Sequence, residues 1–415
     1  MNEEKLISVV MPNYNKADVL AESIQSVLSQ TYHNIQFIII DDGSTDQSPS
    51  IIRKYAEKDS RIEYILCEKN QQICAACNLG LSKVRGEYIA RMDSDDLWET
   101  DKLERQLKYM ESQENCQICF TGVSLIDEFG NSLDEADPEF AALLNQPAKM
   151  REENLRFFFE YGNYLAHPSV MMKTEFQRQL GGYNLAYCQA QDFDYWIRAV
   201  KRTDLHKMPE KLLKLRRFVQ NPEKNLSART EQPTIRWYNE YMMIRSHFFD
   251  DMTDELFERT FRPVFRNPSA GTPEEYACEK AFLLRDQSKF AGRQYPVLGM
   301  LALEQLFRSE KTRQVLKETY HYSLLDFYEE MKRSVFLNPY VDQKIEMCAG
   351  LQQEKAETEK RLQSCRDIVE KQDQEIAVLK VQNQELSKSL EIIQNSACWK
   401  ITAPVRKVLD RLKSK

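Results

Sequence analysis

Two short acidic turns carry residue types that could do chemistry. Residues 41–46 read Asp-Asp-Gly-Ser-Thr-Asp, and residues 93–96 read Asp-Ser-Asp-Asp. Three carboxylates within four residues repel one another unless a cation or solvent screens them. Oxygen ligands of this kind suit Mg²⁺ or Mn²⁺, which keep several waters and bridge to substrate phosphates. The second turn therefore predicts a divalent-cation site for a phosphate-bearing substrate, with a solvated turn before a helix near Thr100 as the alternative.

The first turn has a simpler alternative. Ser44, Thr45 and Asp46 are good helix N-caps, so the segment could be a turn that begins a helix. Capping does not require the adjacent pair at 41–42, and this pair therefore indicates a further role.

Each turn follows a continuous apolar segment that predicts a buried strand. Segments without internal alternation are buried on both faces, as in a parallel sheet that helices cover. The expected strands are residues 6–11, 35–40, 62–66, 88–92 and 169–172, with a helix at 193–200 and an acidic, proline-punctuated loop region at 131–155. We therefore expect an α/β layer structure with a mostly parallel central sheet. Ligands of such sheets bind beyond the carboxyl ends of the strands, where both turns lie.

The order and spacing of these motifs resemble family 2 of the glycosyltransferases, a large group of inverting enzymes with the GT-A nucleotide-sugar-binding fold. The resemblance covers about half of the chain. The matching stretches are residues 8–15 (Ser-Val-Val-Met-Pro-Asn-Tyr-Asn), 40–46, 86–96, 167–171 (His-Pro-Ser-Val-Met), 181–183 (Gly-Gly-Tyr) and 191–196 (Gln-Asp-Phe-Asp-Tyr-Trp). As a set they predict a GT-A domain over residues 1–230.

The resemblance implies a nucleotide-sugar donor, a Mn²⁺ or Mg²⁺ cofactor and a role for each matching residue. Asp42 would contact the base, Asp93 would lie near the ribose and Asp95 would bind the metal. The turn that frames the base contains Pro12, Tyr14 and Asn15. A metal on Asp95 would neutralise the diphosphate leaving group, which is Lewis-acid catalysis.

Asp192 corresponds to the general base of the family, the Asp of a Glu-Asp pair. It would remove the proton of the acceptor hydroxyl while that oxygen attacks the anomeric carbon from the face opposite the diphosphate. A single displacement of this kind inverts the configuration. Asp192 could also be the N-cap of the helix expected at 193–200, and one side chain can serve both purposes.

The chain departs from the family pattern at several positions. Gln191 replaces the usual Glu and removes a carboxylate beside the base, which would reduce the repulsion that raises the pKa of Asp192. Gln72 and Cys77 stand where Gly and Arg are frequent. Residues 215–218 (Leu-Arg-Arg-Phe) lack the His that reaches the metal or diphosphate in many relatives. Arg216 or the following Arg217 could supply the compensating positive charge to the diphosphate.

The resulting expectation is transfer of a UDP-linked sugar to a glycan or lipid-linked acceptor in bacterial cell-surface polysaccharide synthesis. One alternative is a nucleotidyltransferase, but residues 12–16 are not the Gly-rich basic loop that would bind a triphosphate. The other is a catalytically degenerate domain that acts as a dimeric scaffold. The missing His favours that alternative, whereas the four aspartates at 42, 93, 95 and 192 argue against it. We further expect acceptor choice to depend on residues 131–165 and on the helical segment after Glu231.

Composition excludes other classes of protein. The 415 residues carry a formal net charge of -7, which argues against a nucleic-acid binder, because phosphate neutralisation needs an excess of Lys and Arg. No apolar run is long enough to span a bilayer, and the first residues lack the shape of a secretory signal. The expected location is the cytoplasm, either free or peripheral at the inner face of the plasma membrane. Its ten cysteines should then be reduced, and the C-x-x-C pairs at 74–77 and 116–119 are interpreted as buried side chains rather than as a zinc site.

The C-terminal part predicts three helical segments. Residues 231–345 have an aromatic-rich helical pattern, and residues 346–395 lack Pro and show apolar heptads in their second half. The heptad a positions are Leu362, Val369, Ile376, Asn383 and Leu390, and the d positions are Cys365, Gln372, Leu379, Leu386 and Ile393. A single Asn at position a is typical of a parallel two-stranded coiled coil, so we expect a homodimer.

Residues 396–415 predict a basic amphipathic helix. Ile401, Val405 and Leu412 lie at helical spacing, with Lys and Arg residues on the opposite face. Such a helix contacts a membrane surface or a protein partner, or packs on the protein's own body, and periodicity does not separate these possibilities. Residues 396–404 also resemble a tail that follows a coiled coil in bacterial surface-polysaccharide glycosyltransferases.

Overall fold

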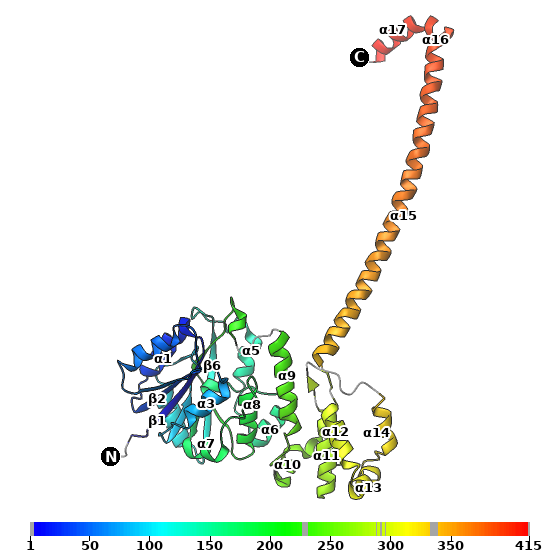
Figure 1. The fold of residues 1–415 in the computed structure, drawn as a ribbon. Helices are drawn as coiled ribbons and strands as arrows, with labels where there is room; N and C mark the ends of the chain where they lie inside the picture. Colours follow the sequence, from blue (N-terminus) through cyan, green and yellow to red (C-terminus); the bar gives the residue numbers. More distant parts are fainter. Residues whose placement is uncertain are drawn as a thin grey trace. The chain divides into compact units, whose positions relative to one another are not determined.

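The computed structural model describes residues 4–225, 231–287, 289–290, 293–294, 296–332 and 339–413. The chain divides into two compact units, Met1–Leu337 and Asn338–Lys415. Strands and helices alternate through the first half of the larger unit, and helices alone follow them apart from one small hairpin (Figure 1).

The α/β part contains eight strands and eight α-helices within its described residues. They are β1 (Ile7–Asn13), α1 (Ala17–Leu28), β2 (Ile35–Asp41), α2 (Ser48–Ala56), β3 (Ile62–Leu66), α3 (Ile73–Leu81), β4 (Tyr88–Arg91), β5 (Leu97–Trp98), α4 (Lys102–Ser112), β6 (Ile118–Ile126), α5 (Pro138–Leu144), α6 (Arg151–Glu160), β7 (Met171–Lys173), α7 (Thr174–Leu180), α8 (Gln191–Val200) and β8 (His206–Arg216). The five predicted strands and the helix before residue 200 are all present, with boundaries that differ by one or two residues.

The strands form one mixed, mostly parallel sheet in the order β3-β2-β1-β4-β7-β6-β8-β5. β1 pairs in parallel with β2 and β4, and β2 pairs in parallel with β3. β6 and β8 are also parallel, whereas β7 runs antiparallel between β4 and β6. The expected fold class, an α/β domain with a mostly parallel central sheet, is confirmed.

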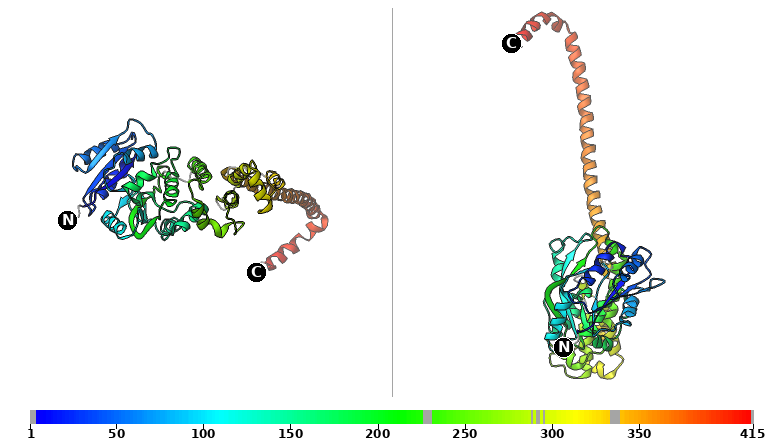
Figure 2. Two further views of the ribbon diagram at one scale, coloured as in Figure 1. Left: turned by 90° about the horizontal axis from the view of Figure 1, so that it is seen from below. Right: turned by 90° about the vertical axis from the view of Figure 1, so that its left-hand side faces the viewer.

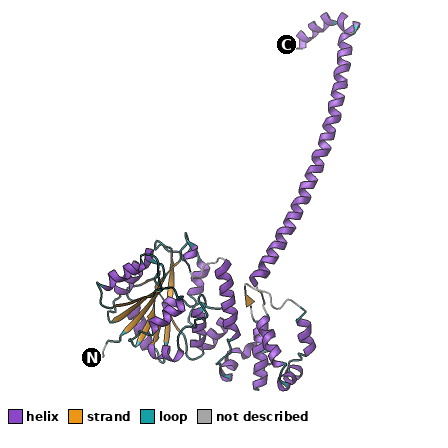
Figure 3. Ribbon diagram, in the orientation of Figure 1, coloured by secondary structure: helices purple, strands orange, loops and turns teal. Residues whose placement is uncertain are grey.

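Helices cover both faces of the sheet (Figure 3). Every residue of β1 and β2 is buried, as expected for strands without alternation. Alternate residues of β1 point to two separate cores. Val9 packs with α1, α2 and α4 on one face, and Val10 packs with α3, α6, α7 and α8 on the other. The four cysteines of the C-x-x-C pairs are buried in these cores as free thiols.

The structure corrects the interpretation of residues 131–155 as a loop region. This stretch contains α5 and the start of α6. Asp137 begins α5 by accepting a hydrogen bond from the N–H of Phe140, and Pro138 occupies the first turn. Acidic residues and Pro favour the first turn of a helix as well as a loop. The composition of the segment therefore did not distinguish the two.

Strands β6 and β8 were not expected from the sequence. β8 has charged residues along its length and Pro209 inside it, a pattern that argues against a central strand. The proline is tolerated because the register between β6 and β8 shifts at Gly122. A Cβ at Gly122 would lie 2.7 Å from the carbonyl oxygen of Pro209, so only glycine fits this irregularity.

The segment after residue 230 is helical, as predicted. Its elements are α9 (Glu231–Ser246), α10 (Asp254–Phe261), α11 (Pro273–Asp286), the strands β9 (Lys289–Phe290) and β10 (Arg293–Gln294), α12 (Val297–Leu306), α13 (Glu310–Glu318) and α14 (Leu324–Glu330). Tyr241, Phe248 and Phe257 share one core with α6 and α8. The predicted boundary at 230 adjoins residues 226–230, which lie outside the described residues, and it stays a prediction.

The second unit begins with one continuous helix, α15 (Pro339–Asn395), in every view (Figures 1 and 2). α16 (Ala397–Ile401) and α17 (Ala403–Lys413) follow it. The helix expected at 346–395 is present within α15, which begins earlier, and the single helix expected at 396–415 is instead two helices, α16 and α17. Pairing through the heptads stays a prediction. In the part of the chain that the structure describes, no helix combines the length and apolar character needed to cross a bilayer.

Candidate active site

The carboxyl ends of β1, β2 and β4 meet at one edge of the sheet, and the first acidic turn is built there. Asn13, the last residue of β1, donates a side-chain hydrogen bond of 2.6 Å to the Asp41 carboxylate at the end of β2. The hydroxyl of Ser44 donates to the same carboxylate oxygen, also at 2.6 Å. Asp41 therefore closes the turn, and this leaves the neighbouring Asp42 for another role.

Asp42 is buried against the segment that precedes α3. One of its carboxylate oxygens accepts a hydrogen bond of 2.9 Å from the N–H of Gln71, and burial raises the pKa of Asp42. Gly43 allows this packing because it has a φ of 73°, and a Cβ there would lie 2.6 Å from the carbonyl carbon of Lys69. The turn thus holds a desolvated carboxyl group at the ligand-binding edge.

The three residues predicted to frame the base differ in exposure. Pro12 is buried within β1, whereas the Tyr14 side chain is 43% exposed. Asn15 has a φ of 52° and accepts a hydrogen bond of 2.8 Å from the N–H of Thr45. Asn15 therefore joins the loop after β1 to the first acidic turn, and Tyr14 presents an aromatic surface next to it.

In the second acidic turn each carboxylate has a different partner. Asp93 forms an ion pair of 2.6 Å with Arg91, and Asp95 forms one of 2.7 Å with Lys16. Asp96 accepts a hydrogen bond of 2.8 Å from the backbone N–H at residue 216. The repulsion expected from the sequence is thus reduced by two protein cations and one backbone donor.

The residues present fit a metal that is carried in with a diphosphate, rather than a metal held by protein alone. Among the described residues, no three His, Cys, Asp or Glu side chains gather as a protein-only cage. Asp95 is the carboxylate of the turn that no backbone group or buried arginine holds. Mg²⁺ typically binds one or two carboxylates and completes its shell with water and phosphate oxygens. Asp95 can contribute one such oxygen when the ammonium of Lys16 moves away.

Arg216 does not present its guanidinium to a ligand. Its side chain is fully buried, and Nε donates to the carbonyl oxygen of Asp95 at 2.8 Å. The two terminal nitrogens contact the carbonyl oxygen of Glu128 at 2.8 Å and the carboxylate of Glu22 at 2.7 Å. This geometry argues against the predicted diphosphate contact. Arg216 instead holds the second acidic turn in place through its hydrogen bond to the carbonyl oxygen of Asp95. It reaches the turn because β8, which ends at Arg216, pairs with β5, which directly follows the turn.

Lys16 is the cation that sequence reasoning missed. Its ammonium lies on Asp95, donates to the carbonyl oxygen of Lys224 at 2.9 Å and sits 4.5 Å from the ring centre of Phe218. Phe218 ends the stretch 215–218, in which the resemblance to the family led us to expect a His. No spacing rule connects residue 16 to residue 218, so the sequence offered no signal for this contact.

Asp192 lies in the first turn of α8, half-buried. One carboxylate oxygen accepts a hydrogen bond of 2.8 Å from Asn163, and the other accepts one of 2.8 Å from the N–H of Phe193. Burial raises the pKa of Asp192 to about 6 despite these hydrogen bonds and the nearby Arg91. The pKa is therefore raised although Gln191 has removed the neighbouring carboxylate, because desolvation is its largest cause and the charge of Asp93 a smaller one.

Arg91 connects the two acidic regions. Its buried guanidinium pairs with Asp93 and lowers the pKa of Asp192, while Asp93 raises that pKa. His167 lies nearby, and burial lowers its pKa well below the usual value, so the imidazole is neutral. Its Nε2 shares a hydrogen bond of 2.7 Å with the hydroxyl of Tyr183. The structure thus brings Asp192 and the second acidic turn together around one buried arginine.

A family match and the relatives in sequence agree on the class. The family described as Glycosyl transferase family 2 matches residues 8–173. An uncharacterized glycosyltransferase of Methanocaldococcus jannaschii is 33% identical over 238 residues, which are 57% of this chain and 78% of that protein. The putative teichuronic acid biosynthesis glycosyltransferase TuaG of Bacillus subtilis is 40% identical over 134 residues, which are 32% of this chain and 53% of that protein.

A solved structure gives a weaker likeness. The crystal structure of residues 1–349 of S. aureus TarS in complex with UDP aligns with 76% of this chain and 91% of that chain, at 16% identity and a TM-score of 0.48. The relatives in sequence and the mostly parallel sheet with both acidic turns at its ligand-binding edge lead to one conclusion: the chain is a glycosyltransferase that belongs to glycosyl transferase family 2.

Proposed function

We propose that this chain is an inverting glycosyltransferase that moves a sugar from a UDP-linked donor to a hydroxyl of a glycan or lipid-linked acceptor. The observation that carries the proposal is Asp192, a half-buried carboxylate held by Asn163 beside the second acidic turn. A carboxylate with a pKa of about 6 is mostly ionised at neutral pH and still basic enough to take a proton.

The reaction is a single displacement. The acceptor oxygen forms a bond to the anomeric carbon, the bond from that carbon to the diphosphate oxygen breaks, and the hydroxyl proton passes to Asp192. The electron pair leaves with the nucleoside diphosphate. Because attack comes from the face opposite the leaving group, the anomeric configuration inverts, and no covalent intermediate on the protein is needed.

The donor side of the site has the complementary task of binding the nucleotide and stabilising the leaving group. Asp42 would accept a hydrogen bond from the base, and Asp93 would lie near the ribose. A Mn²⁺ or Mg²⁺ ion on Asp95 would supply Lewis-acid neutralisation of the diphosphate. Lys16 lies on Asp95 and would provide a further positive charge to the same phosphates.

The biological setting is proposed from one relative. TuaG is named for teichuronic acid biosynthesis, and 134 residues of this chain match it at 40% identity. This supports a role in bacterial cell-surface polysaccharide synthesis, and a cytoplasmic location stays a prediction.

The test is a donor screen. Purified protein is incubated with UDP-, GDP- and dTDP-sugars and Mn²⁺ or Mg²⁺, nucleotide release is measured, and the anomeric configuration of the product is read by NMR. We expect metal-dependent release from a UDP-sugar, loss of it in Asp95→Asn, and an inverted product. A retained configuration would overturn the inverting mechanism, and release from none of the donors would favour the scaffold alternative.

We also propose that the chain is a parallel homodimer through α15. Within the described part of this helix, the side chains at Leu379, Leu386 and Leu390 are exposed on the seam that the heptads define. Pairing would remove these apolar surfaces from water. Sedimentation equilibrium should give twice the chain mass, and Leu379→Glu with Leu386→Glu should give the monomer mass.

The last helix is proposed to contact an anionic membrane surface. Val405, Val408 and Leu412 of α17 are each more than half exposed, and the opposite face is basic. Such a helix gains apolar burial and charge attraction from anionic lipid. The chain should therefore sediment with phosphatidylglycerol vesicles but not with phosphatidylcholine vesicles, and Val405→Ser with Leu412→Ser should remain in the supernatant.

A further inference from the structure

A buried carboxylate from the helical segment lies under the start of α8. Glu240 of α9 is 3% exposed, and its two oxygens accept backbone hydrogen bonds from three successive residues. The N–H groups of Cys188, Gln189 and Ala190 lie 3.0, 2.9 and 2.8 Å from it. Ionised acceptors of this kind make the stronger class of hydrogen bond, and removing one leaves buried donors without a partner.

This contact lies directly before the first turn of α8. Ala190 is the N-cap of α8, and its methyl side chain cannot accept a hydrogen bond from the first turn. Glu240, from a different helix, accepts instead from the N–H of this N-cap residue and of the two residues before it, and places a negative charge at the positive end of α8. Asp192 follows two residues later, and one of its oxygens is bonded to the N–H of Phe193. A shift of residues 188–190 would therefore redirect the Asp192 carboxylate.

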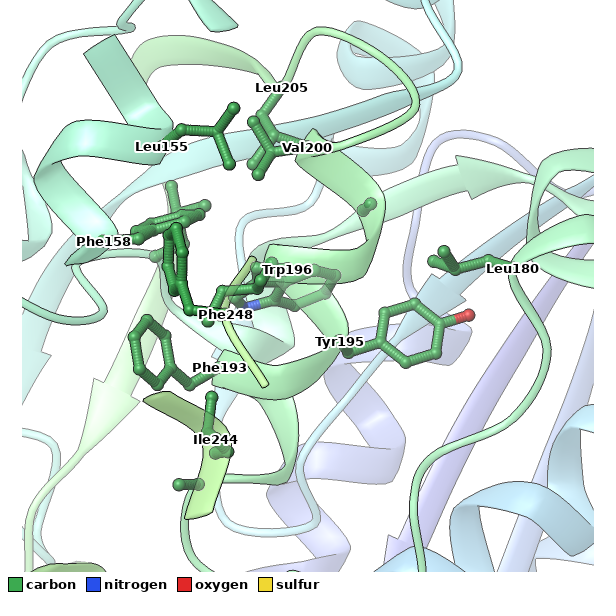
Figure 4. Packing of buried hydrophobic residues seen from close by; sticks show 14 of the residues in the cluster. Leu155, Phe158, Leu180, Phe193, Tyr195, Trp196, Val200, Leu205, Ile244 and Phe248 are labelled. Atoms are coloured by element: carbon green, nitrogen blue, oxygen red, sulfur yellow. The ribbon is translucent and has the colours of Figure 1, made fainter. Parts of the chain in front are cut away.

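α9 is itself held firmly against α8. Tyr241 stacks on Phe193 with ring centres 5.7 Å apart and an interplanar angle of 9°. Ile244 and Phe248 face Phe193 and Trp196 in the packed layer between the helices (Figure 4). The residues that follow Glu240 are thus packed against α8, and its own side chain is buried, so its carboxylate is not a mobile surface group.

We infer that Glu240 is a positioning residue for the sugar transfer, which holds residues 188–190 and thereby aims the Asp192 carboxylate at the acceptor hydroxyl. The inference rests on the proposed function and deepens it, because it makes the helical segment after residue 230 a part of the catalytic apparatus. Glu240 does not touch the substrate in this account. It acts through the backbone that carries the base.

The experiment compares Glu240→Gln with a matched control, Glu279→Gln. Glu279 of α11 is also buried and accepts hydrogen bonds from two successive backbone N–H groups, those of Arg266 and Asn267. Both variants should lose thermal stability. Only Glu240→Gln should lower kcat, by tenfold or more, with the KM for the donor unchanged, because the donor side of the site is built from other elements.

The pH profile supplies a readout that a purely structural role would not move. The charged and titratable groups facing Asp192 are Arg91, Asp93 and Tyr183, and none of them changes in the variant. When residues 188–190 loosen, water reaches Asp192, and its pKa should fall from about 6 toward the ordinary value. The acid limb of kcat should therefore move to lower pH in Glu240→Gln and stay in place in Glu279→Gln.

Glu240→Asp provides a milder variant that keeps the charge, and it should give an intermediate loss of kcat even if Glu240→Gln does not fold. Amide hydrogen exchange at residues 188–190 should be faster in Glu240→Asp than in wild type, and faster still in Glu240→Gln. Equal kcat values and acid limbs in wild type and folded Glu240 variants would overturn the inference. If the wild type transfers no sugar while exchange at 188–190 still depends on Glu240, the proposed function fails and the anchoring contact stands as structural.

Discussion

The two sides of the site are built in different ways. The donor side comes from turns at the carboxyl ends of β1, β2 and β4, where Asp42 follows β2 directly and Asp95 lies four residues after the end of β4. The base side comes from the first turn of α8, and its contacts come from Asn163 after α6 and from Glu240 on α9. The donor side is therefore local in sequence around each strand, whereas the base side depends on helices that meet only in the folded chain.

This difference predicts which substitutions should affect only the donor side or only the base side of the site. A parallel sheet fixes its strand ends through a continuous backbone ladder, so each donor-side turn should tolerate changes in the helical segment. The base has no such ladder. Its position depends on a few side chains, so the largest effects on kcat without an effect on nucleotide binding should come from residues at or around Asp192.

Asp192→Asn should have the largest effect. An amide cannot take the acceptor proton, and general-base catalysis contributes about 10²–10⁴-fold, so kcat should fall by roughly 10³-fold. Nucleotide affinity, measured by calorimetry, should not change. Asp194→Asn is the matched control because it removes an acidic group of the same helix that pairs with Arg198. A kcat for Asp192→Asn within a few fold of wild type would place the base elsewhere.

Asp95→Asn should have the next largest effect, and on the opposite side of the site. Loss of the metal-binding oxygen removes electrostatic stabilisation of the leaving diphosphate, which is worth about 10²–10³-fold in comparable sites. Here nucleotide affinity should also fall in the presence of Mn²⁺ and should match wild type in EDTA. Equal Mn²⁺ dependence of binding in variant and wild type would separate Asp95 from the metal.

The pH dependence of kcat tests the role of Asp192 on the base side of the site. Burial raises the pKa of Asp192 to about 6, and the protonated form cannot accept a proton, so activity is present above this pKa and lost as the pH falls through it. With saturating donor and acceptor, kcat should decline about tenfold per pH unit below pH 6, because the ionised fraction does. An acid limb near pH 4 would mean that Asp192 is solvated in the working enzyme.

Lys16→Met should have a smaller effect, which strengthens metal binding but lowers the catalytic efficiency. The ammonium no longer lies on Asp95, so Mn²⁺ should bind the nucleotide-bound protein more tightly, as measured by the paramagnetic signal of free Mn²⁺. Loss of one charge-assisted contact to the diphosphate should lower kcat/KM roughly tenfold. Weaker Mn²⁺ binding in the variant would show that Lys16 assists the metal instead of competing with it.

Asn163→Ala should have the smallest effect on rate. It removes one hydrogen bond to Asp192, worth about 1 kcal/mol or roughly fivefold in kcat. Because that hydrogen bond favours the ionised carboxylate, its loss should raise the pKa of Asp192 and move the acid limb to higher pH. The direction is opposite to that expected for Glu240→Gln, so the two variants separate local hydrogen bonding from solvent entry.

The sequence alone determined the strands that end in the acidic turns, and with them the fold class and the family. Continuous apolar segments are sufficient for buried parallel strands, and the turns that follow them must lie at one edge of the sheet. It also indicated the long helix of the second unit, because residues 351–393 contain neither Pro nor Gly. Residue-level roles at the site, including those of Asp42, Asp93 and Asp192, remain predictions.

Only the tertiary structure decided which charges meet. Arg216 belongs to a family motif, yet its guanidinium is bonded to backbone carbonyl oxygens and to Glu22. Lys16, which no motif singles out, forms the ion pair with Asp95. The charged strand β8 forms because a bulge at Gly122 accommodates Pro209. Glu240 lies 48 residues after Asp192 in the chain and bonds the backbone of residues 188–190, just before Asp192, only because α9 packs on α8. Such contacts depend on where side chains converge in space, which local propensity and spacing do not encode.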